Sequence, residues 1–214
     1  PHCWRTDKPV LYYPLDSWFI KTTAVKDKLI ELNNTINWKP ESTGTGRFGN
    51  WLENLVDWNL SRSRYWGTPL PIWRTEDGSE ELCFGSVEDL VQALQTALSS
   101  GKLSEAQTKG NEAFIAAVKA GEADLHRPYV DNIFVLSTSG TVMGRESDLI
   151  DVWFDSGAMP FAQWHYPFEN QEIFKQSYPA DFISEGVDQT RGWFFTLHAI
   201  SAMVEESVAF KNVV

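Results

Sequence analysis

The sequence has few of the features that mark secreted or membrane proteins. Only two cysteines, Cys3 and Cys83, occur in 214 residues, and two thiols cannot build the disulfide framework of a small secreted domain. There is no run of about 18 apolar residues that would cross a bilayer. The N-terminus lacks the basic start and apolar centre of a signal peptide. The sequence therefore predicts a cytoplasmic protein with no membrane partner.

Positive charge is also scarce. The chain has 18 Lys and Arg against 29 Asp and Glu, a net charge of −11 at pH 7. A stand-alone nucleic-acid binder normally carries a basic face, so this class is disfavoured, although one piece of a larger enzyme that binds nucleic acid is not excluded. Hydrophobic residues make up 43% of the chain and ten residues are Trp. This content is sufficient for a folded core.

Hydrophobic periodicity predicts an α/β protein. Helices are expected at 23–37, 48–55, 86–98, 111–120 and 191–206, and strands at 9–20, 129–136, 181–184 and 210–214. We expect irregular structure at 57–73, a loop at 99–110 and a turn at 137–141. Strand, loop, helix and strand at the C-terminal end are typical of a βαβ unit in a parallel sheet.

One candidate site lies where the predicted strand 181–184 enters the last helix. In open α/β sheets ligands bind beyond the carboxyl ends of strands. Glu185 and Asp188 would accept hydrogen bonds from an ammonium or ribose hydroxyls, and Gln189 offers both donor and acceptor. Gly186 would allow close backbone approach or a positive φ. The alternative is a capped helix with a solvated acidic turn.

A second candidate is the segment 151–157, Asp-Val-Trp-Phe-Asp-Ser-Gly. If it is a strand, Trp153 and Phe154 face opposite sides, and one of them is left for a pocket. Asp155, Ser156 and Gly157 would then form a cap and turn before a helix at 158–163. The alternative is that the Trp is simply a core residue.

A third candidate is the segment 57–69, in which Arg62 and Arg64 alternate with aromatic residues. Arginines beside aromatic rings are a common means of holding phosphates and unstacked bases. The alternative is that both arginines stack on neighbouring rings at the surface.

These segments resemble the isoleucyl-tRNA synthetases of class I. His2–Arg5, then 57–73, 151–157 and 185–194, follow the order found in that family after its editing insertion, and valyl and leucyl relatives lack the Asp-Gln-x-Arg-Gly-Trp string. The resemblance implies the second part of a Rossmann-like parallel-sheet catalytic domain together with a connective-peptide core. It implies a connective-peptide core at 1–84 and a catalytic segment at 126–214. The helices predicted between these segments indicate a helical insertion at 85–125, which the resemblance does not cover.

The resemblance also implies a function. The parent enzyme would activate isoleucine with ATP and Mg²⁺ to isoleucyl-adenylate, and would transfer the acyl group to tRNA(Ile). The residues implied to line the adenylate and amino-acid site are Glu185, Gly186, Asp188, Gln189, Trp153 and Trp193. The last two would flank the isoleucine side chain, and Arg62 and Arg64 would face the tRNA acceptor end. No catalytic acid or base is implied.

The sequence departs from the family pattern in two ways. The ATP-binding signatures His-x-Gly-His and Lys-Met-Ser-Lys-Ser and the threonine-rich editing segment are absent. We therefore expect a fragment that is inactive alone, with an open sheet edge that favours self-association. Thr6 also replaces the second cysteine of the family's His-Cys-x-x-Cys zinc knuckle, so we expect no zinc.

Two other classes of function are compatible with the sequence. A binding module would stack sugars on several Trp side chains at one flat exposed surface. A structural fragment would retain the site residues without using them.

Overall fold

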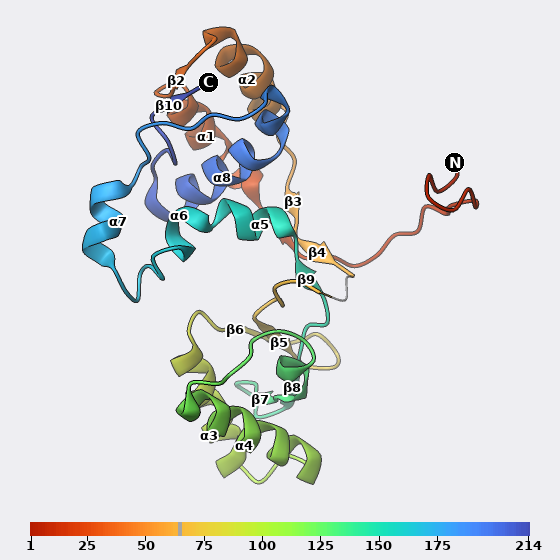
Figure 1. The fold of residues 1–214 in the computed structure, drawn as a ribbon. Helices are drawn as coiled ribbons and strands as arrows, with labels where there is room; N and C mark the ends of the chain where they lie inside the picture. The colour runs from red at the N-terminus through yellow and green to blue at the C-terminus, as the bar shows by residue number, and fades with distance from the viewer. Residues whose placement is uncertain (64–65) are drawn as a thin grey trace.

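The computed structural model describes residues 1–63 and 66–214, which form two lobes and an extended N-terminal segment (Figure 1). One lobe holds α1 (Lys26–Asn33), α2 (Gly49–Glu53) and α8 (Trp193–Glu205). The other holds α3 (Val87–Ser99), α4 (Glu105–Ala120) and a small sheet. Between them, β4 (Ser61–Arg62) pairs antiparallel with β9 (Leu149–Ile150). No helix in the described ranges is long and apolar enough to cross a membrane.

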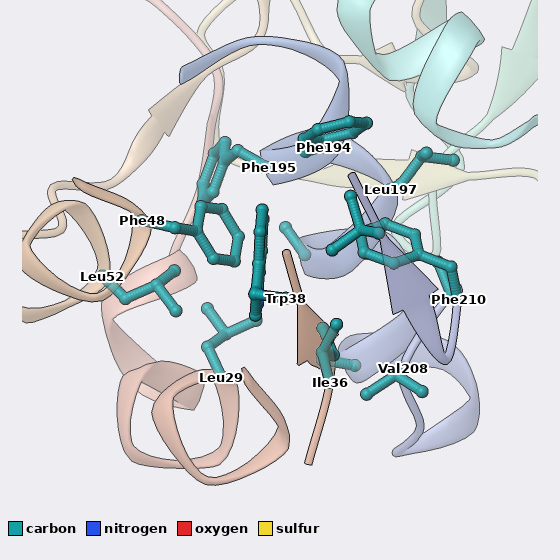
Figure 2. Close-up of a cluster of buried hydrophobic side chains, with 14 of the residues drawn as sticks. Leu29, Ile36, Trp38, Phe48, Leu52, Phe194, Phe195, Leu197, Val208 and Phe210 are labelled. Atoms are coloured by element: carbon teal, nitrogen blue, oxygen red, sulfur yellow. The ribbon is translucent and has the colours of Figure 1, made fainter. Parts of the chain in front are cut away.

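The core of the first lobe joins two distant parts of the sequence. Figure 2 shows Leu29, Trp38, Phe48 and Leu52 packed against Phe194, Phe210 and neighbouring apolar residues. A 3-10 turn (Thr22–Val25) precedes α1, and a π-helical turn (Thr43–Phe48) precedes α2. Residues 22–55 and 183–213 therefore form one packing unit.

The helix predicted at 23–37 ends early, at Asn33. The buried Asn33 amide donates to the Gly44 carbonyl at 3.1 Å and accepts from the Trp38 indole at 2.9 Å. The Asn33 side chain thus satisfies hydrogen-bonding groups of the residues that follow α1, and the chain turns into β2 (Asn37–Trp38). The apolar periodicity therefore predicts a helix end four residues beyond the observed one.

The predicted parallel βαβ unit is confirmed. Strand β10 (Asn212–Val213) pairs in parallel with β2, and Val213 also forms a parallel bridge with Ile183. Helix α8 connects residues 183 and 212, with the right chain order for a crossover. The strand expected at 181–184 is reduced to an isolated bridge at Ile183, preceded by another at Ala180.

The second lobe is an antiparallel sheet covered by two helices. The strand order is β6 (Glu81–Cys83), β5 (Ile72–Arg74), β8 (Val142–Arg145), β7 (Val135–Leu136). Ser86 caps α3 as predicted, because its hydroxyl accepts from the Asp89 amide at 3.1 Å. The turn predicted at 137–141 joins β7 to β8, with Gly140 at φ +80°.

Three predicted elements are wrong or too long. The loop at 99–110 is largely helical, because Ser104 and Gln107 form a capping box that starts α4 at Glu105. The strand at 9–20 is reduced to β1 (Phe19–Ile20), paired with β3 (Trp58–Asn59). The strand at 129–136 is reduced to β7, because Tyr129–Asn132 forms a 3-10 turn after Pro128.

The segment 151–157 is also not a strand. It forms α5 (Val152–Gly157), with Asp151 as its N-cap. Three further elements follow it: α6 (Met159–Ala162), α7 (Gln171–Ser177) and the 3-10 turn Val187–Arg191 that leads into α8. The alternation argument for Trp153 and Phe154 therefore does not apply, and a helix places both near α8.

Candidate functional site

Helices α5 and α8 pack at very close range. A Cβ added to Gly157 would lie 2.8 Å from Thr196 Cβ and 2.9 Å from the Thr196 backbone, so only glycine permits this approach. Beside this contact, the Trp193 indole donates to the Ser156 carbonyl at 2.9 Å. The end of α5 and the start of α8 are therefore fixed to each other, and with them Trp153 and Trp193.

Gln189 lies at the same junction. Its Oε1 accepts from the Trp193 amide at 3.0 Å, and its Nε2 donates to Asp188 Oδ2 at 3.1 Å. A Cβ added to Gly192 would lie 2.9 Å from Gln189 Oε1 and 3.6 Å from Trp153 Cη2. Gly192 thus lies where Trp153, Gln189 and Trp193 converge. The Trp153 side chain is only partly covered, with 42% of the residue exposed.

The acidic residues of the predicted site lie on the outside of the turn. Glu185, Gly186 and Asp188 are all exposed. Gly186 has φ −62°, so the positive φ considered from the sequence is not what its glycine provides. A Cβ there would lie 2.5 Å from Asp188 Oδ1. Glycine therefore lets the Asp188 carboxylate fold back over the backbone.

Two residues from the N-terminal part of the first lobe support this turn. Arg47 Nε donates to Thr190 Oγ1 at 2.8 Å, and the buried Thr190 hydroxyl donates to the Val187 carbonyl at 2.8 Å. The Arg191 guanidinium lies 5.6 Å from the centre of the Trp51 ring. Sequence reasoning missed both contacts, because Arg47 and Trp51 are about 140 residues away and no local pattern links them.

Asp151 and Arg62 form an ion pair beside α5. Asp151 Oδ2 lies 2.8 Å from Arg62 Nη2 and accepts from the Trp58 indole at 3.1 Å. The Asp151 side chain is only 7% exposed. Arg62 therefore has partners within the protein, whereas the sequence suggested only phosphate, base or ring contacts. Arg64 lies outside the described residues.

Asp155 lies one helical turn beyond the cap. Burial raises the pKa of its carboxyl, and the nearby Asp151 charge adds to this, while Thr68 and His126 oppose it. Asp151 forms an ion pair with Arg62, whereas Asp155 forms no ion pair within the described part of the chain. The two carboxylates at the ends of this helical turn therefore have different environments.

Two hollows in the described part of the structure lie away from the predicted site. Within the described residues no three His, Cys, Asp or Glu side chains gather as metal ligands, so we assign no ligand to Mg²⁺. A cavity of about 530 Å³ is lined by Trp73, Phe84 and Leu90 from the second lobe and by Phe168 before α7. A second hollow lies along residues 74–78 and 144–147. Neither is lined by the predicted adenylate residues.

Several curated proteins of one name are similar to the whole length of this chain. Isoleucine–tRNA ligase of Cytophaga hutchinsonii is 71% identical over 214 residues, which is all of this chain and 18% of that protein. The Bacteroides thetaiotaomicron enzyme of the same name is 65% identical over 219 residues, and that of Clostridium novyi 49% over 213. The chain spans less than one fifth of the length of these curated relatives.

A more distant likeness exists among solved structures. The ternary complex of Agrobacterium radiobacter K84 agnB2 LeuRS with tRNA and LeuAMS has a TM-score of 0.45 and 16% identity, over 96% of this chain and 24% of that one. The family described as "tRNA synthetases class I (I, L, M and V)" matches residues 7–214. The chain therefore belongs to the class I tRNA synthetases.

Proposed function

We propose that this chain is a segment of an isoleucine–tRNA ligase and carries part of its amino-acid and adenylate site. The observation that supports this most strongly is the 71% identity to an isoleucine–tRNA ligase over the whole chain. The whole enzyme would act in the cytoplasm. It would use ATP and Mg²⁺ to convert isoleucine to isoleucyl-adenylate, and would transfer the acyl group to tRNA(Ile).

The convergence at Gly192 supports the assignment of the amino-acid side of the site. The partly exposed Trp153 ring and the Trp193 ring offer apolar surface for a branched side chain. The Gln189 Nε2 carries two N–H groups, and one of them is accounted for by Asp188. We assign the second N–H to the aminoacyl part of the ligand.

The exposed acidic residues suit the nucleotide side. Glu185 and Asp188 carry carboxylates at the surface of the turn that follows the Ile183 bridge, which is where ligands of open α/β sheets lie. Carboxylates accept hydrogen bonds from ribose hydroxyls. Gly186 between them leaves the space beside the backbone that the Asp188 carboxylate occupies.

The proposed chemistry requires positioning rather than a protein base. An isoleucine carboxylate oxygen would attack the α-phosphorus of ATP in line, the bond to the leaving oxygen would break, and pyrophosphate would depart. Such transfers depend on alignment and charge stabilisation. Trp153, Trp193 and Gln189 would supply alignment. Since the described residues offer no ligand set for a metal ion, we derive no step through Mg²⁺.

Other parts of the sequence-based interpretation stay predictions. Helices α3 and α4 both lie inside the proposed helical insertion 85–125, between the proposed segments 1–84 and 126–214. Arg62 and Arg64 are the candidates for the tRNA acceptor end. Self-association through the sheet edge would be tested by analytical ultracentrifugation of the chain.

The test of the proposed function is isoleucine-dependent ATP–pyrophosphate exchange by the full-length protein that carries this chain. We expect exchange with isoleucine, weaker exchange with valine and none with leucine. The isolated chain should give none, because both ATP-binding signatures are absent from its sequence. Absence of isoleucine-dependent exchange by the full-length protein would rule out the proposed function.

A further inference from the structure

The carboxylate of Asp151 connects three elements. Its Oδ1 accepts from the Trp153 amide at 3.3 Å, which caps the N-terminus of α5. Its Oδ2 accepts from the Trp58 indole at 3.1 Å and pairs with Arg62 at 2.8 Å. A carboxylate that is nearly excluded from water requires such partners, because an uncompensated charge there is costly. The orientation of Asp151 is therefore set by Arg62 and Trp58.

Arg62 is itself held in place. Its Nη1 donates to the carbonyls of Asn59 and Ser61 at 3.1 and 2.8 Å, while its Nη2 reaches Asp151. Strand β4, which contains Arg62, is paired with β9 immediately before Asp151. A planar guanidinium forms such bonds in fixed directions, which the ammonium of Lys cannot reproduce. The guanidinium thus forms a rigid connection between β4 and the start of α5.

Helix α5 transmits this connection to the proposed amino-acid site. The helix has only six residues. Asp151 and Arg62 fix its first turn, which contains Trp153. The Ser156 carbonyl fixes its last turn to the Trp193 indole, and the Gly157 contact with Thr196 keeps α5 against α8. Displacement at the Arg62 end would therefore move the Trp153 ring relative to Trp193.

We propose that Arg62 and Asp151 are positioning residues for amino-acid activation, which act through α5 on the two tryptophans that flank the isoleucine side chain. The inference rests on the proposed function and deepens it. It assigns Arg62 to the first half-reaction, in which tRNA has no part. A residue that served only to contact the tRNA acceptor end would have no influence on that half-reaction.

The experiment uses the full-length protein in ATP–pyrophosphate exchange without tRNA. Arg62→Gln should raise the KM for isoleucine by roughly 10- to 100-fold, since a misplacement of about 1 Å can cost that much, and should leave the KM for ATP unchanged. Arg62→Lys should recover part of the loss, because the charge opposite Asp151 is retained. The matched control is Arg127→Gln, since Arg127 also pairs with an aspartate and its side chain is 36% exposed against 35% for Arg62.

A double-mutant cycle tests whether the two residues act as a unit. Asp151→Asn keeps the size of the side chain and an acceptor for the Trp153 amide, but removes the charge opposite Arg62. The double variant Arg62→Gln/Asp151→Asn should be no worse than the poorer single variant, because both changes break one connection. If the double variant instead shows the product of the two single-variant increases in the KM for isoleucine, the inference is wrong.

Other outcomes separate the inference from misfolding and from failure of the proposed function. A variant that merely unfolds lowers kcat in proportion to the lost protein and leaves both KM values unchanged; circular dichroism checks this directly. If exchange by Arg62→Gln equals wild type while aminoacylation of tRNA falls, Arg62 is a tRNA contact and the inference is wrong. If wild type itself shows no isoleucine-dependent exchange, the proposed function has failed first.

Discussion

Replacement of Gly157 by alanine gives a direct test of the packing between α5 and α8. The added Cβ would lie 2.8 Å from Thr196 Cβ and 2.9 Å from the Thr196 carbonyl carbon and oxygen. Nonbonded carbon atoms prefer about 3.5–4.0 Å. The two helices would have to separate by roughly 0.7 Å or more at this point, because most of the opposing atoms are backbone and have no other rotamer to adopt.

The magnitude follows from two opposing terms. Overpacking in a close-packed contact typically costs about 1–3 kcal/mol. Alanine is favoured over glycine within a helix by up to about 1 kcal/mol, but Gly157 is the last residue of α5, so this gain is small. We therefore expect Gly157→Ala to lower the free energy of unfolding by about 1–3 kcal/mol, and the melting temperature by about 2–4 °C for each kcal/mol.

The assay is urea unfolding of wild type and variant, followed by tryptophan fluorescence. Gly46→Ala is the matched control, because Gly46 also lies in a helical segment and its added Cβ would meet no atom within 4 Å outside its own helix backbone and chain neighbours. The control should be neutral or slightly stabilised. Gly157→Ala with the same stability as wild type would show that α5 and α8 are not in the close contact described.

Two further predictions concern stability. Burial lowers the pKa of His198 from 6.5 to about 4, so the free energy of unfolding should fall by about 1.4 kcal/mol per pH unit as the pH drops from 6.5 towards 4. Urea unfolding at pH 7 and pH 5 should therefore show a smaller loss of stability for His198→Gln than for wild type. An equal loss in both proteins would contradict this. Loss of the capping box in Ser104→Ala should lower the free energy of unfolding by about 1 kcal/mol, measured by thermal unfolding. Ser99→Ala, at an exposed serine that caps no helix N-terminus, should leave it unchanged.

The fold could be predicted from the sequence where local signals agree with packing. Helix α8 and the cap at Ser86 follow from apolar periodicity and capping chemistry, and both are present. The capping box at Ser104 is also a local signal, but the polar composition of residues 99–110 favours a loop and so predicts the wrong structure there. The error shows that a helix with a half-exposed surface is defined by its cap as much as by its hydrophobicity.

The parts that could not be predicted depend on long-range contacts. The end of α1 at Asn33 is set by Gly44 and Trp38, and the support of the site turn is set by Arg47, which bonds Thr190 across 143 positions. Such partners leave no local pattern. Similarly, the pairing of Arg62 with Asp151 joins two segments recognised separately in the sequence, and only the structure shows that they meet.

The number of tryptophans is visible in the sequence, but which of them are buried is visible only in the structure. Composition alone permitted a flat surface of exposed rings that would stack sugars, but Trp38 and Trp73 are 5% and 2% exposed and belong to two separate cores. Trp153 at 42% exposure is different, because it lies at the junction of α5 and α8. Membership of the class I tRNA synthetases explains the order in which the recognised segments follow one another in the sequence. The packing of α5 against α8 explains how the segments 151–157 and 185–194 come together.

The most direct measurement is the affinity of the full-length protein for a non-hydrolysable isoleucyl-adenylate analogue, by titration calorimetry, with Trp153→Ala and the distant, exposed Trp4→Ala compared to wild type. If Trp153 forms a wall of the isoleucine pocket, its loss should cost about 2 kcal/mol or more, roughly 30-fold in Kd, and Trp4→Ala should bind as wild type. Equal affinity of wild type and Trp153→Ala would show that the junction at Gly192 is not the amino-acid site.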